Sequence, residues 1–178
     1  VMIIIGLLIG GILKGQELIN NSRVTATVAQ IKGIDGAIST FRDKYSALPG
    51  DMANPAGRLP GCNAVPCNVT GNGDSVILAN AAGANFGSAV PVATGVNGEG
   101  VRAFSHLAAG DMISGVNPTA AGAVTAGVHL PEAKVGGVFF LGHRANGLQA
   151  HTAAATNAPR SGHYIAINGS VAAVAAAT

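Results

Sequence analysis

Histidine and cysteine are the residue types in this chain best suited to chemistry. No two of the five histidines have the HxxxH or HExxH spacing that brings two imidazoles together on one helix face to bind a metal. His143, His151 and His163 lie in or beside one loop region and can meet in space. The other two histidines are His106 and His129. The simpler interpretation is that all five lie on the surface.

The two cysteines, Cys62 and Cys67, lie five residues apart in CNAVPC. This spacing differs from the redox motif CxxC, and two cysteines alone make a poor metal site. An even cysteine count in an exported protein favours a disulfide. The sequence therefore predicts a Cys62–Cys67 bond that closes a short surface loop.

No catalytic arrangement stands out. Residues 71–75 (GNGDS) are typical of a turn, because they lack the recurring acidic ligands of a calcium loop. The sequence contains no phosphate-binding loop, nucleophile–base motif or pair of catalytic carboxylates that we can recognise. We expect no catalytic residue, no metal and no cofactor, and we expect that the chain is not an enzyme.

Composition excludes one class of partner. Only 10% of the 178 residues are charged, against about 25% in an average soluble domain. The net charge of +2 comes from scattered residues of both signs, so no nucleic-acid partner is expected.

The strongest signal is the apolar run at residues 1–13, VMIIIGLLIGGIL. As a helix it would be about 20 Å long, short of the ~30 Å core of a bilayer. A buried core helix or the apolar part of a signal peptide are the ordinary interpretations. No basic residue precedes the run and no small-residue cleavage site follows it, which disfavours a signal peptide. Because there is no initiating Met, we expect further apolar residues upstream that would complete a membrane span.

The apolar run continues into an amphipathic helix. Apolar residues recur in steps of three or four, which is the pattern of one helix face, at Val24, Val28, Ile31, Ile34, Ile38, Phe41 and Tyr45. Leu48 precedes Pro49 and is biased out of the helical conformation, so the helix should end at residues 45–47. The sequence predicts one helix of about 45 residues, near 65 Å long.

These residues resemble a known family. The segment VMIIIGLLIGGILKGQELI is similar to the N-terminal segment of type IV pilins and of the pseudopilins of type II secretion. Residues 40–52 (TFRDKYSALPGDM) and 98–115 (GEGVRAFSHLAAGDMISG) resemble the end of the long helix and a short second helix in one pilin-like subgroup. The family's peptidase site and early glutamate do not occur in this sequence, and its end lacks the acidic stretch of some relatives.

The resemblance implies an α+β fold in which a long N-terminal helix packs on a small antiparallel sheet. Residues 1–23 would be the membrane anchor and filament core, residues 24–48 the amphipathic half of the same helix, and residues 49–178 the head. We expect a short helix at 98–109, with Val101, Phe104 and Leu107 or Ala108 facing inward. Strands are expected at 135–141 and 163–168, a weaker strand at 124–130, and a short strand or helical turn at 75–79. The expected filament-core residues are Ile3, Ile4, Ile5, Leu7, Leu8, Ile9, Ile12 and Leu13.

Four glycines interrupt the apolar helix, namely Gly6, Gly10, Gly11 and Gly15. Each costs about 1 kcal/mol of helix stability relative to alanine. Their spacing fits close GxxxG packing between helices. We favour a second interpretation, in which the segment is helical in lipid and unwinds in the filament, as happens near a proline in the resembled family.

Lys14 and Glu17 would mark the border of the core and pair with each other or across subunits. Gly33 and Gly36 are expected to let the helix approach the sheet closely.

The function implied is a structural pilin that polymerises with itself into an extracellular filament for adhesion, attachment or motility. Before assembly it would lie in the inner membrane and meet the pilus assembly machinery. A type II secretion pseudopilin is the alternative. A membrane-anchored periplasmic binding protein or enzyme is the third possibility.

Overall fold

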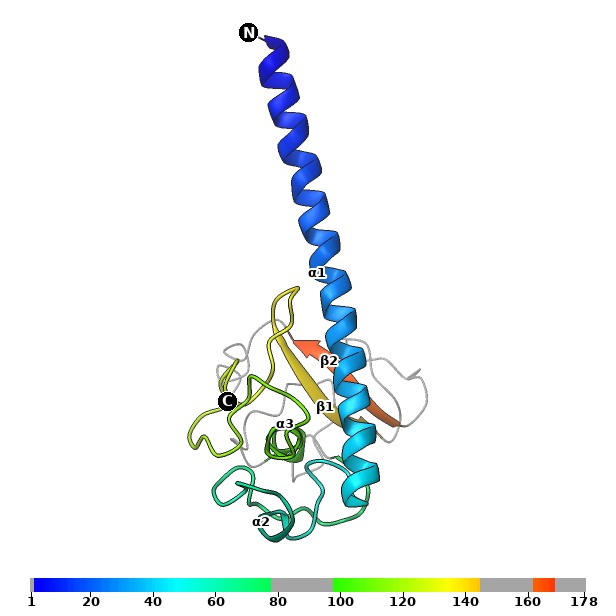
Figure 1. Ribbon diagram of the computed structural model, residues 1–178, viewed down its shortest axis with the longest axis vertical. Helices are drawn as coiled ribbons and strands as arrows, with labels where there is room; N and C mark the ends of the chain where they lie inside the picture. The colour runs from blue at the N-terminus through cyan, green and yellow to red at the C-terminus, as the bar shows by residue number, and fades with distance from the viewer. Residues whose placement is uncertain (1, 78–97, 145–161, 169–178) are drawn as a thin grey trace, which may run out of the picture.

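The protein consists of a long N-terminal helix joined to a head (Figure 1). The computed structural model describes residues 2–77, 98–144 and 162–168. The elements in chain order are α1 (Met2–Tyr45), α2 (Pro55–Arg58), α3 (Glu99–Ala109), β1 (Val138–Arg144) and β2 (Gly162–Asn168). A long helix with a small two-stranded antiparallel sheet agrees with the predicted α+β class.

The end of α1 lies where the sequence predicts it. Ser46 adopts the left-handed conformation, with φ of 51°, and its amide still bonds to the Arg42 carbonyl at 2.8 Å. Pro49 then prevents any continuation, because it restricts Leu48 to extended conformations. The chain therefore leaves the helix at a defined point and turns into the head.

The amphipathic stripe of α1 packs only over its second half. Ile34 and Phe41 are buried, and Ile31, Ile38 and Tyr45 pack partly against the same core. Upstream of this contact, Val24 and Val28 of the stripe are exposed, because the described part of the head does not reach them.

Two small residues, Thr27 and Ala37, were not part of the predicted stripe but are buried on the contact face of α1. Gly33 and Gly36 are exposed, and a Cβ at either would meet no other atom. The expectation that these two glycines allow a close approach to the sheet is therefore wrong.

The sheet pairs β1 with β2 in antiparallel register, with Leu141 opposite Ile165 at its centre. β1 begins three residues later than predicted, because Gly136 and Gly137 have φ of 101° and 85° and form a turn. Residues 124–130 form turns with one isolated bridge rather than a strand, so that prediction is wrong. Residues 75–77 are neither strand nor helix, and 78–79 lie outside the described residues.

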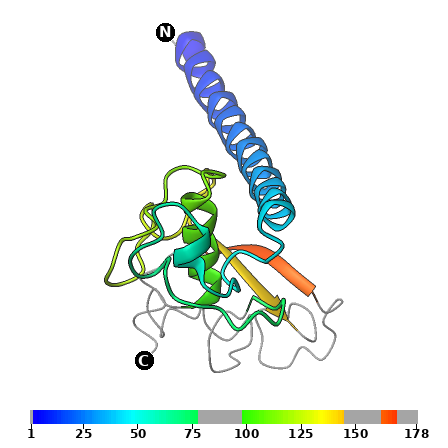
Figure 2. The same cartoon turned by 60° about the horizontal axis from the view of Figure 1, so that its bottom comes forward.

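The core of the head is shared by α1, α3 and β1. Phe41, Phe104 and Phe139, one from each element, are fully buried. α3 lies beside β1, as Figure 2 shows, and it also contacts α1. Val101 and Leu107 of α3 are buried as predicted, whereas Ala108 is half-buried. Each such apolar side chain contributes roughly 1.5–3 kcal/mol through burial.

Candidate functional site

The first candidate site is the part of α1 that projects beyond the head. Thr27 is the first buried residue along the described side chains, and every residue from 8 to 26 is exposed. Six Leu and Ile side chains here are each 53–71% exposed, and we call them the apolar surface: Leu8, Ile9, Ile12, Leu13, Leu18 and Ile19. A surface of this kind marks an interaction site.

The predicted filament-core residues divide into two groups. Leu8, Ile9, Ile12 and Leu13 belong to the apolar surface. The other four lie in α1, but their side chains are outside the described part of the chain: Ile3, Ile4, Ile5 and Leu7.

The glycines of the projecting segment are helical in the single chain, since α1 runs unbroken through Gly6, Gly10, Gly11 and Gly15. A Cβ added at any of the last three would meet nothing within 4 Å. The fold of the single chain therefore gives no steric reason for glycine at these positions.

Lys14 and Glu17 form an ion pair of 2.7 Å between Nζ and Oε2, three residues apart on α1. Of the two arrangements expected, the structure shows pairing within one chain. The side chains are 77% and 60% exposed, so water screens their attraction. Within the described residues, no helix combines the length and hydrophobicity that crossing a membrane requires.

A second feature is a clamp between α1 and the loop at residues 131–137. The Gln30 amide donates to the Glu132 carbonyl and accepts from the Lys134 amide, both at 3.0 Å. The Thr27 hydroxyl accepts from the Val135 amide at 3.1 Å. The Gln30 side chain thus bonds to the loop backbone as the backbone of a neighbouring strand would. These bonds attach the loop to α1 about one helical turn before Ile34, the first core residue of α1.

The third feature is a joint centred on His106 of α3. The Gly50 amide donates to His106 Nδ1 at 2.9 Å, so the ring proton is on Nε2 and donates to the Cys67 carbonyl, also at 2.9 Å. The ring is fully buried and stacks on Phe41 of α1 at 6.3 Å between centroids. Burial lowers the pKa of His106 to about 4, although the bond to Cys67 acts in the opposite direction. One neutral imidazole therefore joins α1, the segment after it and the cysteine loop.

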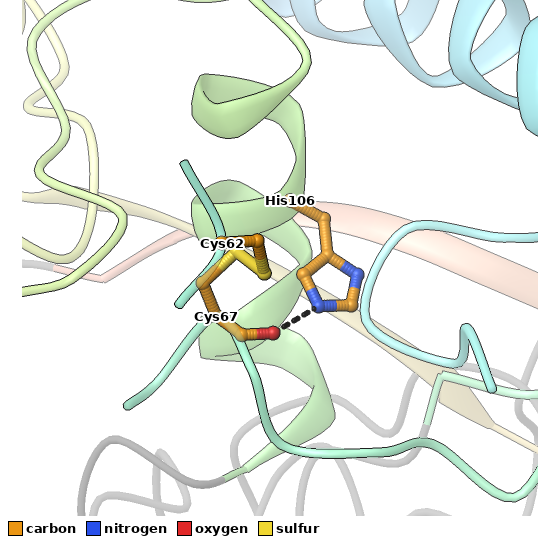
Figure 3. A group of neighbouring side chains, drawn as sticks. All are labelled: Cys62, Cys67 and His106. Carbon is orange, nitrogen blue, oxygen red and sulfur yellow. Dashed lines mark hydrogen bonds between the residues drawn. A yellow bond between two sulfur atoms is a disulfide. The ribbon is translucent and has the colours of Figure 1, made fainter. Parts of the chain in front are cut away.

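The cysteines are bonded to each other, as predicted, and lie beside His106 (Figure 3). The three residues form the one cluster of potential metal ligands within the described ranges, with their ligand atoms inside 4.8 Å. The arrangement does not suit a metal, because the sulfurs are oxidised to a disulfide and both His106 nitrogens already have hydrogen bonds. The cluster is best understood as structural.

Charged residues hold the loop that follows the cysteines. The Asp51 carboxylate accepts from the Gly73 and Ser75 amides, both at 2.7 Å. Arg102 of α3 donates to the carbonyls of Val69 and Thr70 at 2.9 and 2.7 Å. These buried charges fix residues 69–75 against the start of α3.

The structure corrects the expectation that all histidines lie on the surface. His106 and His129 are buried, and His129 bonds the Thr125 amide and the Ala120 carbonyl within its own loop. His143 and His163 do meet, with ring centroids 4.9 Å apart, whereas His151 lies outside the described residues.

Sequence reasoning missed the roles of Gly50, His106, Thr27 and Gln30. A local signal exists for Gly50 alone, because the Pro-Gly pair marks a turn.

Comparison of the chain with known proteins finds no relative. No family model, no curated protein and no solved structure matches the chain.

Proposed function

We propose that this chain is a structural subunit that polymerises through the apolar surface of α1 into an extracellular filament of the type IV pilus kind, used for adhesion, attachment or motility. The observation that carries the proposal is the exposure of residues 8–26 on a helix that the head does not cover. Exposing such a surface to water is unfavourable, and neighbouring helices of the same kind would bury it.

The energetics favour assembly. Burying six Leu and Ile side chains contributes on the order of 10 kcal/mol per subunit before the entropic cost of association. The Lys14–Glu17 pair supports this, because charges that already neutralise each other are less costly to enclose than separate ones.

Two further features fit an exported subunit. The Cys62–Cys67 disulfide is typical of proteins that fold in an oxidising compartment. The clamp and the His106 joint hold the head on the helix, so that a filament built from the helices would carry the heads outward. Before assembly, the inner membrane and the assembly machinery would be the partners of the apolar surface.

Electron microscopy of the purified full chain tests the proposal. We expect filaments from the natural sequence and none from Leu13→Asp, whose charge would be buried at every subunit contact. Ser39→Asp is the matched control, because Ser39 is exposed on the same helix beside the head. Both variants should keep the folded head, as measured by circular dichroism.

Normal filaments from Leu13→Asp would contradict the proposal. Short assemblies together with lost protein secretion after gene deletion would favour the secretion pseudopilin instead. A protein that remains monomeric in detergent-free buffer would favour the membrane-anchored binding protein or enzyme.

A further inference from the structure

Two histidines hold one buried residue at the end of the sheet. His143 of β1 lies directly opposite His163 of β2 in the strand register. The His143 amide donates to the Ile77 carbonyl at 2.7 Å, and the Ile77 amide donates to His163 Nε2 at 3.2 Å. Ile77 is 1% exposed. Both backbone groups of Ile77 therefore depend on this pair of histidines.

The bond from Ile77 specifies the protonation of His163. An imidazole nitrogen that accepts a hydrogen bond carries no proton, so neutral His163 has its proton on Nδ1. When His163 takes up a second proton, Nε2 becomes a donor and faces the amide donor of Ile77. The hydrogen bond is then lost, and the buried amide has no acceptor.

Burial and two neighbouring basic side chains oppose the protonation of His163. The described groups facing it are His143 of β1, Arg42 and Asp43 of α1, and Asp51 after α1. His163 remains exposed as a residue, yet the part of its ring against Ile77 is removed from water. This burial, followed by His143 and Arg42, lowers the pKa of His163, and Asp51 acts in the opposite direction.

Protons reach the ring directly. His163 lines an open pocket of about 530 Å³ together with Arg42, Asp43 and Ser75. Within the described residues, Arg42 has no ion pair that would cancel its charge. Protonation of His163 therefore adds a second positive charge beside Arg42.

We propose that His143, His163 and Ile77 form an acid-sensitive latch, which holds residues 76–77 on the sheet at neutral pH and releases them when His163 is protonated, while Ser75 stays bonded to Asp51. The other end of this loop is held by Asp51 and by a bond from the Gly71 amide to the Met52 carbonyl, so release is local. The latch does not depend on filament formation, and it operates in a single subunit.

Hydrogen exchange measured by NMR on the full chain in detergent micelles tests the latch. Between pH 7.5 and pH 5, we expect the protection of the Ile77 amide, corrected for intrinsic exchange, to fall about tenfold or more. The Gly71 and Phe104 amides report the far end of the loop and global opening, and their protection should change less. The His163 ring signals should titrate below the ordinary histidine value of about 6.5.

His163→Gln separates the latch from general acid effects, because glutamine offers an acceptor that does not titrate. In this variant the protection of Ile77 should be the same at both pH values. His143→Gln and Arg42→Gln remove neighbouring positive charge and should move the opening midpoint to higher pH. An Ile77 amide that loses protection equally in natural and His163→Gln chains would overturn the proposal, as would constant protection while His163 titrates.

Discussion

At the scale of single residues, His106 connects more of this molecule than any other polar side chain described. It accepts from Gly50, donates to Cys67 and stacks on Phe41, so it links α3 to the end of α1, the segment after α1 and the cysteine loop. Residues 40–52 and 98–115 meet at this ring, which makes it a physical contact between the end of α1 and α3.

The first prediction concerns the pH dependence of stability. The pKa of His106 is lowered to about 4 in the folded protein, against about 6.5 when unfolded. The unfolded chain therefore binds more protons between these values, so stability is complete above pH 6.5 and decreases as the pH falls toward 4. We expect a loss of about 2 kcal/mol between pH 7 and pH 5, measured by denaturant unfolding. His106→Gln should be less stable at pH 7 and should lose less on acidification; an equal pH dependence in both chains would contradict this.

The second prediction concerns Gly50. Its φ is 89°, and a Cβ there would collide with the Glu99 carbonyl at the start of α3. We expect Gly50→Ala to lower the free energy of unfolding by at least about 2 kcal/mol, through backbone strain and displacement of α3.

Gly61→Ala is the control for Gly50→Ala, because Gly61 has a φ of 70° but open space around its Cβ position. Gly61→Ala should lower the free energy of unfolding only through backbone strain, by about 1 kcal/mol. Equal losses in the two variants would show that the contact with Glu99 contributes nothing.

At the scale of elements, local sequence signals predicted the features that depend on local physics. The end of α1 follows from Pro49, and the disulfide from the short separation of Cys62 and Cys67. The short helix α3 was expected only from the resemblance of residues 98–115 to a known pattern. The sequence also indicated both strands, although β1 is displaced because Gly136 and Gly137 form a turn. The residues that determine each of these features lie close together in the sequence.

The rest of the fold depends on contacts between distant segments. Gln30 bonds to residues more than a hundred positions away. No local pattern indicates that its side-chain amide will bond to a loop backbone. Exposure of Val24 and burial of His129 likewise depend on where the head ends and how a loop closes. Periodicity could indicate which face of α1 is apolar, but not how much of that face the head covers.

The third prediction tests the clamp. Gln30→Ala should reduce the hydrogen-exchange protection of the Lys134 amide about fivefold to tenfold, because one neutral hydrogen bond is lost. Gln16→Ala, an exposed position of the same helix, is the matched control and should leave Lys134 unchanged. If Lys134 remains equally protected in Gln30→Ala, the clamp does not hold the loop.

At the scale of the whole molecule, α1 has two parts with different physical roles. From Thr27 to Tyr45 its buried face belongs to the core of the head, whereas residues 8–26 extend for about 30 Å beyond it. A subunit of this shape can change the projecting part without unfolding the head. Properties of the filament we propose, such as its length per subunit, would then be determined by residues 8–26.

The last prediction concerns the glycines of the projecting part. In one subunit, Gly10, Gly11 and Gly15 are helical with free space for a Cβ, so a triple alanine variant should stabilise the helix by up to about 3 kcal/mol. If these glycines allow the backbone to become partly extended in the filament, the variant should give filaments with altered subunit spacing. Each extended residue rises about 3.3 Å against 1.5 Å in a helix, so unwinding six residues lengthens the segment by roughly 10 Å. Cryo-electron microscopy of both filaments measures the spacing, and Gly33→Ala is the control for added helix stability outside the segment. A continuous helix in the natural filament, or identical spacing in the triple variant, would exclude unwinding.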